Sequence, residues 1–481
     1  MKPVAASVCA AAAALLMAAC LKVPNYSKPA AFTAPADNGQ LPAQYTESNG
    51  WKQAQPAGQS LPEDWWKIFG IAELDALEAQ MDVSNQSIQA ADAQFRQARA
   101  LVAEVRAGLS PTLSTNPSIS TNRNSHTTPF SSQTVGEYSN LELPFDLSYE
   151  LDAWGRIHRS VAAARAGMQA SAADLAAVRL SMHAEMALDY FELRSLDAQK
   201  RLLESTLTAY QKALDVNQNR FDGGLASGAD VAQARTQVES TRAQSVDVDE
   251  ARAQYEHAIA ALAGRSPESF HLERNPLEAT PPPVPTGIPS QLLERRPDIA
   301  AAERRMAAAN QQIGIAQAAF YPILQITAAG GFQSGSIVDW FNWPSRFWAL
   351  GPSAFETLFD AGRRRAAAQA AQAAYDEAVA NYRQAAIDAF REVEDSLSAL
   401  RVLETEAGAQ RVAVEAAERS LALSNNRYQG GLVTYLEVVV TQSTALANER
   451  VEVDLQRRRM EACVLLIKAL GGGWNVSQLP S

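Results

Sequence analysis

Few residues of this chain have the types and the spacing that catalysis or metal binding requires. Its five histidines are scattered, without a second histidine, a cysteine or a paired acid at a convincing metal-ligand spacing. They are His126, His158, His183, His257 and His271. The sequence holds no nucleophile elbow and no phosphate loop, and Gly471-Gly472-Gly473 is typical of a helix end. These patterns argue against an enzyme and predict no metal and no bound cofactor.

One cysteine does have a recognisable chemical setting. Residues 1–19 have the features of a signal peptide, with Lys2, an alanine-rich apolar core and small residues before Cys20. An ending on cysteine resembles the bacterial lipoprotein box, in which that cysteine is acylated; a plain signal peptide is the alternative. We expect a covalent lipid on Cys20, and Leu21 after it indicates release to the outer membrane. Cys463 is then the one remaining thiol, so no disulfide framework is possible within a chain.

The other candidate chemistry lies in a repeat built around two glycine pairs. Residues 219–225, with Gly223-Gly224, return 207 residues later as 426–432, with Gly430-Gly431. The register holds over about 110 residues, which indicates one duplicated body. Each pair predicts a helix cap and a tight turn, because glycine tolerates the left-handed conformation that ends helices. Equivalent acids, Asp230 and Glu437, follow the two turns.

Long helices must position these turns. Residues 156–221 contain no proline and one glycine, and the same holds for residues 363–428. Both segments are rich in strong helix formers. Each would extend for roughly 100 Å as one helix, and apolar residues seven apart favour coiled-coil packing. A second helix is predicted after each turn, over 229–262 and 436–470.

Two further helices are predicted at 72–109 and 298–320, and each stops at a proline, Pro111 or Pro322. The aromatic run 65–69 precedes the first of them. These rings could face a membrane, but packing under the extended N-terminal segment is favoured.

After each proline the pattern alternates with a period of two, which predicts β-strands. The predicted strands are 112–121, 139–151, 323–332 and 347–358. Polar loops are expected over 122–138 and 333–345. The second strand is apolar on one face and charged on the other, and eleven such residues tilted by about 45° cover roughly 25 Å, which suits a bilayer. Two hairpins that cover a soluble core are the alternative.

The composition excludes some classes of partner, and the order of the patterns along the sequence divides the chain into parts. It has 481 residues and a formal charge of −11, and this acidic balance speaks against nucleic acid as a partner. No run of about 18 apolar residues follows Cys20, so no transmembrane helix is predicted. We predict six parts: signal peptide 1–19, lipid-anchored extended segment 20–62, first repeat 63–270, linker 271–290, second repeat 291–474 and C-terminal tail 475–481.

The strands impose a condition on assembly. Strand edges cannot face lipid unpaired, and four strands are too few for a barrel, which needs about eight. If the hairpins span a membrane, several chains must therefore pool them. The fold class expected is mixed and mainly α, with a two-fold internal repeat, long antiparallel helices and four membrane β-strands per chain.

The chain resembles the TolC-like outer membrane efflux factors, in their lipoprotein branch. The motifs that carry the resemblance follow one another along nearly the whole mature chain: 16–20, 65–69, 151–156, 293–299, 358–363 and the two glycine turns. The resemblance implies a homotrimer, in which a twelve-stranded β-barrel in the outer membrane continues into a long α-helical barrel across the periplasm. The shorter helices would then stack end to end, 72–109 with 229–262 and 298–320 with 436–470.

The same resemblance implies a function and partners. Such trimers are passive ducts that dock onto a periplasmic adaptor (membrane fusion) protein and an inner-membrane efflux pump of the resistance-nodulation-division type. They export drugs, metals or other small toxic compounds and so contribute to antibiotic resistance.

The resemblance places the glycine turns at the periplasmic tip, which polar links close in members at rest. Arg427 and Tyr428 match that neighbourhood, and Glu437 matches an acidic-ring position, whereas Val440 replaces a second acidic position and weakens any such ring. Three symmetry copies of Asp230 and Glu437 around one axis would repel one another and prefer counter-ions or arginine partners such as Arg427. A polar latch is therefore expected, with ordinary N-terminal helix acids as the alternative.

Two other classes stay open at this point. A periplasmic coiled-coil adaptor lipoprotein would share the long helices but would lack a membrane hairpin at 139–151. A helical pore-forming protein would need neither Cys20 nor duplicated hairpins.

Overall fold

The computed structural model describes residues 26–29, 61–123, 137–277, 279–284 and 289–481. The predicted signal peptide 1–19, the lipid site Cys20 and most of the segment 20–62 lie outside the described residues, as do parts of the linker 271–290 and of the loop 122–138. The described residues form two compact units. The first contains residues 26–29, Phe95–Ala170 and Ala302–Tyr382, and the second contains residues 61–94, Ser171–Ala301 and Arg383–Ser481.

Two helices of equal length dominate the chain. Helix α4 covers Arg156–Asp222 and helix α8 covers Arg363–Gln429, each with 67 residues, in agreement with the two long runs of helix formers. Asp152 accepts backbone N–H groups of the first turn of α4 at 2.8 and 2.9 Å. Asp360 accepts two N–H groups at the start of α8 at 3.0 and 3.1 Å. A carboxylate thus satisfies the free donors at the positive end of each helix dipole.

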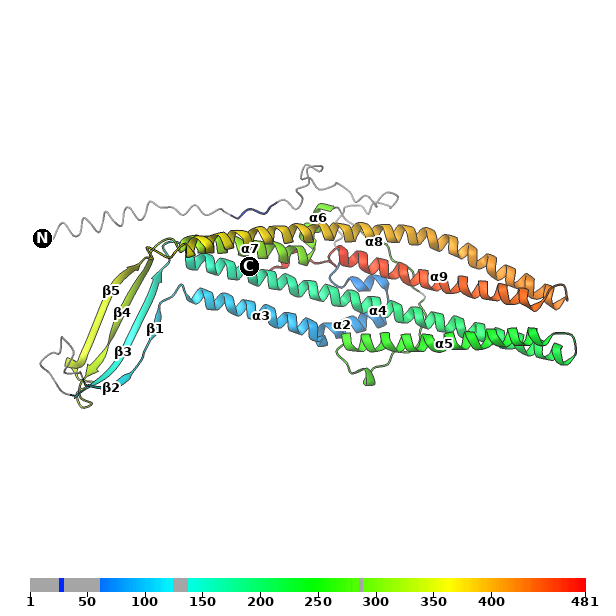
Figure 1. The fold of residues 1–481 in the computed structure, drawn as a ribbon, viewed down its shortest axis with the longest axis horizontal. Helices are drawn as coiled ribbons and strands as arrows, with labels where there is room; N and C mark the ends of the chain where they lie inside the picture. Colours follow the sequence, from blue (N-terminus) through cyan, green and yellow to red (C-terminus); the bar gives the residue numbers. More distant parts are fainter. Residues whose placement is uncertain (1–25, 30–60, 124–136, 278, 285–288) are drawn as a thin grey trace. The chain divides into compact units, whose positions relative to one another are not determined.

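A glycine turn leads from each long helix into a returning helix, α5 (Gly228–Leu262) or α9 (Tyr435–Ala469). Gly224 and Gly431 have φ of 74° and 71°, in the left-handed region. The leucine after each pair donates its N–H to the carbonyl five residues earlier, at 2.7 and 2.9 Å, which is the bond of a Schellman cap. Within the second unit α5 therefore runs back along α4, and α9 along α8 (Figure 1).

The single helix expected over 72–109 is wrong, because two helices occur there, α2 (Ala72–Ser84) and α3 (Gln86–Ala107). They are separated by Asn85, whose backbone is extended with ψ of 121°. The Oδ1 atom of Asn85 accepts two N–H groups of the first turn of α3, at 2.9 and 3.1 Å. Its Nδ2 atom donates to the carbonyl of Leu262, the last residue of α5, at 2.9 Å. One side chain therefore caps the start of α3 and the end of α5.

The second copy has the same junction with a different residue. Its two helices are α6 (Pro289–Arg295) and α7 (Pro297–Ala318). Arg296, which lies between them, donates from Nη1 to the carbonyl of Ala469, the last residue of α9, at 3.2 Å. Asp298 and Glu392 also bind its guanidinium, each at 2.6 Å. Thus α3 follows α5 end to end and α7 follows α9, as the resemblance implied.

The aromatic run 65–69 packs inside the second unit. It forms the short 3-10 helix η2 (Trp65–Phe69), in which both tryptophans are buried. The Trp66 ring stacks on the ring of His183 with 4.3 Å between centroids. The Phe69 ring meets the Phe191 ring edge to face at 5.0 Å. Packing against α4, and not exposure to a membrane, is the role of these rings.

The strands form one antiparallel sheet within the first unit (Figure 1). They are β1 (Thr112–Ser114), β2 (Ser118–Arg123), β3 (Glu137–Leu151), β4 (Ile323–Ser334) and β5 (Arg346–Phe355). The order is β1-β3-β4-β5, and β2 pairs with β3 as well. The strand predicted at 112–121 is therefore two short strands beside β3, and the one predicted at 347–358 ends earlier. Direct pairing of β3 with β4 joins the two hairpins into one surface.

The register gathers apolar residues on one face of the sheet and most polar residues of β3 and β4 on the other. Leu147 lies opposite both Leu113 and Ala328, and Ala328 lies opposite Leu350. Directly opposite residues point to the same face of a sheet, so one face, here called the apolar face, is apolar on all four strand positions. It carries Leu113, Ile119, Leu141, Leu143, Phe145, Leu147, Tyr149, Leu151, Leu324, Ile326, Ala328, Phe332, Trp348, Leu350, Pro352 and Ala354. The opposite face, here called the polar face, also holds some apolar residues, namely Pro144, Ile323, Ala329, Phe347, Ala349 and Phe355. Its polar residues are Asn122, Glu142, Asp146, Ser148, Glu150, Gln325, Thr327 and Gln333.

The loop between β4 and β5 is not polar, so that expectation for 333–345 is wrong. Ile337, Val338, Phe341 and Trp343 are 62 to 82% exposed in it. Serine and glycine at its start gave the sequence a turn-like composition, which concealed the apolar residues that follow. No helix among the described residues is long and apolar enough to cross a bilayer.

Candidate functional site at the glycine turns

At the second turn an arginine and an acid bind each other across the glycine pair. Arg427, in the last turn of α8, donates from Nη1 to Oε1 of Glu437 at 2.7 Å. Ser424, which is buried, donates to the same oxygen at 3.5 Å. The side chains of Arg427 and Glu437 are 54% and 38% exposed, so water screens the pair and it contributes less than about 1 kcal/mol. Such an ion pair holds the two side chains in one arrangement but contributes little free energy. Either residue can therefore exchange its partner for another.

Tyr428 joins the two copies of the repeat. Its hydroxyl donates to Oδ1 of Asn217 in α4 at 2.5 Å, and Asn217 is 1% exposed. The Tyr428 ring packs against Tyr435 with 5.3 Å between centroids, and the guanidinium of Arg220 lies 4.8 Å from its centre. Burial raises the pKa of Tyr428, so the hydroxyl remains a neutral donor. The end of α8 is therefore fixed to α4 by one hydrogen bond and by ring contacts.

The equivalent acid of the first turn behaves differently. The carboxylate of Asp230 accepts the N–H and the hydroxyl of Ser227, both at 2.9 Å, while Ser227 Oγ accepts the N–H of Asp230 at 3.2 Å. This reciprocal capping box satisfies free donors at the start of α5. In α9 the corresponding Thr434 makes no such side-chain bond. The structure thus brings Arg427 and Glu437 together, whereas Asp230 binds within its own helix start.

Sequence reasoning missed three residues that complete this site, namely Asn217, Arg220 and Ser424. A signal for two of them was present, because Asn217 and Ser424 stand 207 residues apart, at equivalent places of the repeat. Both are polar, both lie in long helices and both are buried. A buried polar residue kept at the same place in both copies predicts a hydrogen-bond partner nearby. The stacking of Arg220 on Tyr428 had no local signal, because the two residues belong to different copies.

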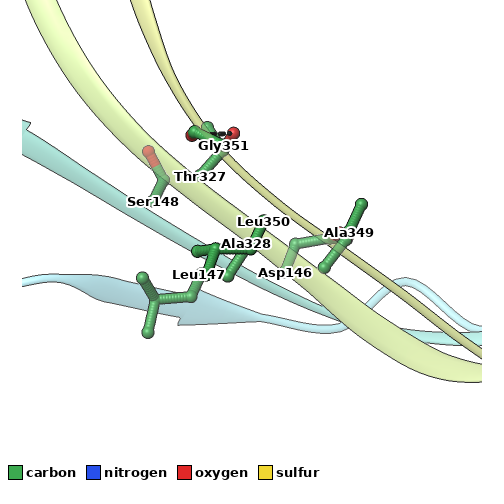
Figure 2. A pocket seen from close by; sticks show the side chains of 9 residues that line it. Asp146, Leu147, Ser148, Thr327, Ala328, Ala349, Leu350 and Gly351 are labelled. Atoms are coloured by element: carbon green, nitrogen blue, oxygen red, sulfur yellow. Dashed lines mark hydrogen bonds between the residues drawn. The ribbon is translucent and has the colours of Figure 1, made fainter. Parts of the chain in front are cut away.

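The sheet offers a second candidate surface. A hollow of about 430 Å³ is lined by residues of strands β3, β4 and β5. Figure 2 shows the side chains that line it. Leu147, Ala328 and Leu350 line it from the apolar face, and Thr327 Oγ1 donates to the carbonyl of Gly351 at 3.3 Å. The hollow is open and has few polar groups. It is therefore a depression of the sheet surface between small and large side chains, and not a binding pocket.

His183 and Cys463 are both buried, and their surroundings indicate structural roles. His183 is buried and bonds through Nδ1 to Glu78 at 2.7 Å and through Nε2 to Asp82 at 3.2 Å. Burial raises the pKa of Cys463 to about 12, which leaves its thiol unreactive. No cluster of three or more metal-binding side chains is found among the described residues.

Comparison with known proteins places the chain in a group. The profile of the family described as "Outer membrane efflux protein" matches residues 78–265 and 288–472. The chain is 32% identical over 472 residues to the pyoverdine export outer membrane protein OpmQ of Pseudomonas aeruginosa, with 96% of each chain covered. It is 31% identical over 471 residues to the solvent efflux pump outer membrane protein SrpC of Pseudomonas putida, with 97% of this chain and 98% of the relative covered.

A solved structure supports the same grouping. The fold matches the outer-membrane channel OprN with a TM-score of 0.87 and 26% sequence identity. The match covers 95% of this chain and 100% of that one.

Proposed function

Because the chain belongs to the outer membrane efflux protein family, it is an outer-membrane efflux channel, and we propose that three copies of it build one continuous duct. The observation that carries this proposal is the separation of apolar and polar residues on the sheet. An apolar face suits lipid outside, and the charged and amide side chains of the polar face suit a water-filled interior. The two alternatives, a coiled-coil adaptor and a helical pore-forming protein, do not account for membership of this family.

The open edges of the sheet support a trimer. The chain contributes four strand positions, with β1 and β2 at one edge and β5 at the other. In lipid, each of these edges needs a hydrogen-bonding partner. Pairing β5 of one copy with the opposite edge of the next, three times, gives a closed barrel of twelve strands with no free edge. The long helices would continue this duct through the periplasm as an α-helical barrel.

The relatives support a passive role for the duct. One relative is named for pyoverdine export and another for solvent efflux, yet this chain is equally similar to both, at 32% and 31% identity. We infer that cargo is selected by an inner-membrane pump and a periplasmic adaptor protein, and that the channel passes small toxic compounds, drugs or metals that they deliver. The proposed duct needs no catalytic cofactor.

A lipid on Cys20 would hold each copy to the outer membrane. Tyr26 follows six residues later, and its hydroxyl donates to Glu303 in α7. The Nζ atom of Lys28 lies 5.7 Å from the centre of the Tyr382 ring. Six residues reach at most about 20 Å. These contacts therefore keep the proposed anchor within a short reach of the first unit, to which all four residues belong.

We propose that the contacts of the second turn hold the periplasmic end of the duct closed. Arg427, Tyr428 and Glu437 make the bonds that an adaptor could exchange for its own, while Asp230 maintains the first turn as a helix cap. The acidic ring formed by Glu437 would be weak, because Val440, which replaces the second acidic position, is apolar and 57% exposed.

The test is single-channel conductance in a planar bilayer. We expect the double variant Arg427→Ala, Tyr428→Phe to conduct more than the unchanged protein, because it lacks both the ion pair with Glu437 and the hydroxyl bond to Asn217. Arg242→Ala is the matched control, since Arg242 also pairs with a glutamate, Glu239, at 2.8 Å, but within one helix.

Equal conductance of the double variant and the control would contradict the latch. Absence of any conductance in the unchanged protein and in all variants would contradict the duct itself.

A further inference from the structure

The loop between β4 and β5 has four large apolar side chains that are mostly exposed. Ile337 is 72% exposed, Val338 82%, Phe341 62% and Trp343 74%. Four exposed large apolar residues within seven positions are more than scattered surface residues explain, and such a patch marks an interaction site. The loop joins the strand ends that lie opposite the connections to the helices.

Hydrogen bonds within the loop fix this display. Ser345 Oγ donates to the carbonyl of Asp339 at 2.6 Å, and Asn342 Nδ2 donates to Oδ1 of Asp339 at 2.9 Å. The N–H of Val338 donates to Ser336 Oγ at 3.3 Å. Several polar groups of the loop are therefore satisfied internally, which lowers the cost of moving the loop out of water. The apolar side chains remain mostly exposed in this arrangement.

Aromatic contacts join the loop to the apolar face of the sheet. The Phe341 ring meets the Phe332 ring at 5.6 Å, and Trp340 stacks on Phe341 at 5.0 Å. The indole N–H of Trp340 donates to the carbonyl of Phe332 at 3.4 Å. Phe332 lies on the apolar face, opposite Leu143 and Arg346. The patch of the loop is thus continuous with the surface that the proposed function places against lipid.

The loop also begins at the limit of the apolar face. Ser334, the last residue of β4, lies opposite Leu141, where the long apolar row of β3 starts. That row, from Leu141 to Leu151, rises about 25 Å at the usual strand tilt, the height of the apolar band of an outer-membrane barrel. The loop then lies at the level of the lipid headgroups.

The side chain of Arg346 lies beside these aromatic rings. Arg346, the first residue of β5, is exposed, its Nε donates to the carbonyl of Trp343 at 3.0 Å, and its guanidinium lies over the Trp343 ring. Tryptophan prefers the membrane interface, where its ring meets both apolar and polar surroundings. Arginine beside it can reach a lipid phosphate while its stem remains among apolar groups.

We propose that loop 335–345 is an interfacial anchor, which inserts Val338, Phe341 and Trp343 among the lipid headgroups at the outer surface and binds a lipid phosphate through Arg346. The proposal rests on the proposed function, because it takes the apolar face as lipid-facing. The partner is the lipid surface and not a second copy of the chain, since the patch continues the lipid-facing row of the sheet.

The experiment compares three single labels on the full mature protein in vesicles of phosphatidylethanolamine and phosphatidylglycerol. The cysteine variants Val338→Cys, Leu350→Cys and Asn122→Cys, each in a Cys463→Ser background, carry an environment-sensitive fluorophore. Leu350 lies on the apolar face and Asn122 on the polar face, so they are the lipid and water references. Quenching by a nitroxide on the lipid headgroup and by aqueous iodide is then measured.

We expect the lipid-borne quencher to act on the label at 338 at least about twofold more strongly than on the label at 122, with protection from iodide. Iodide quenching of 338 equal to that of 122 would overturn the anchor, because the loop would then lie in water. Protection from both quenchers would also overturn it, because another copy would then cover the loop. If iodide quenches the label at 350 as strongly as the label at 122, the apolar face lies in water, and the proposed function fails, not the anchor alone.

A second variant tests the phosphate contact. Replacing phosphatidylglycerol with a neutral lipid should shift the emission of the label at 338 to longer wavelength, because fewer anionic groups hold the loop. Arg346→Gln should abolish that shift, whereas Arg123→Gln, at the end of β2, should keep it. A shift that survives Arg346→Gln would overturn the role of Arg346.

Discussion

The two glycine turns begin from equivalent residues and distribute their charges in different ways. In the first turn Asp230 completes a capping box with Ser227, so its carboxylate binds within its own helix. In the second turn Glu437 reaches back across the glycines to Arg427, and Thr434 forms no side-chain cap. A duplicated segment has therefore kept its backbone path while one copy became a self-contained cap and the other a linkage between helices.

The helix junctions show the opposite behaviour. Asn85 and Arg296 differ in size and charge, yet both donate to the last carbonyl of a returning helix, α5 or α9. After that carbonyl, Gly264 and Gly471 both have positive φ, at 67° and 92°. At the junctions the two copies have different side chains that make the same contact. At the glycine turns they have equivalent side chains that make different contacts. Backbone geometry is the shared part of the repeat, and side-chain partners are where the copies diverge.

The largest expected effect tests the shared part. A Cβ at Gly264 would lie 2.9 Å from the backbone carbon of Ser84, and one at Gly471 would lie 2.8 Å from that of Arg295. We expect Gly264→Ala and Gly471→Ala each to lower the free energy of unfolding by about 2–4 kcal/mol, through strain and collision. Thermal unfolding in detergent, followed by circular dichroism, measures this. Gly408→Ala is the control, because it lies in α8 with no atom within 4 Å and should stabilise slightly. A loss at one junction alone would show that the junctions are not equivalent.

The next effect tests a difference in titration. Burial, together with Glu185 and Glu192, raises the pKa of Asp189 from 3.8 to about 7, whereas the equivalent residue in the second copy is Ser396. The folded state therefore binds this proton more tightly than the unfolded state, so stability is full below about pH 4 and falls as the pH rises towards 7.

We expect Asp189→Ser to raise the melting temperature at pH 8 by about 2–4 °C and to leave it unchanged at pH 4. Melting curves from pH 4 to 8 measure this change. Ser396→Asp is the reciprocal variant and should lower the melting temperature at pH 8 alone. Equal shifts of Asp189→Ser at both pH values would show that packing, and not titration, is responsible.

The smallest effect tests the caps. Ser227→Ala should cost about 1 kcal/mol, because it removes the capping box of α5, while Thr434→Ala should cost less than about 0.5 kcal/mol. Amide hydrogen exchange in the first turns of α5 and α9 reports each cap locally. Faster exchange in α9 than in α5, each in its own variant, would reverse the assignment of the capped turn.

Local patterns predicted the long elements well. The run of helix formers from Arg156 and from Arg363 gave the starts of α4 and α8, because an aspartate and a glycine precede each of them. Alternation gave β3 and its two faces, since a period of two leaves each residue little choice of side.

Other features depend on residues that are distant in sequence. The break at Asn85 was missed because asparagine also occurs inside helices, and the carbonyl that accepts its amide, that of Leu262, lies far along the chain. The bond from Tyr428 to Asn217 joins the two copies, so neither copy predicts it. The loop 335–345 was misread because composition was judged from its small residues, whereas its bulky residues determine its surface.

The end-to-end junctions have a consequence for biogenesis. Each junction is a hydrogen bond within one copy, between residues 85 and 262 or between residues 296 and 469. These two bonds therefore join residues that are far apart in sequence but belong to the same half. Slow, long-range closure of this kind must wait until the distant segment has been synthesised. The junction of the first half can therefore close while the second half is still being synthesised. The second junction closes only when residue 469 is in place, and the residues after it also reach the first half, where Gln478 donates to Glu63 at 2.6 Å. A late truncation would therefore remove contacts of both halves.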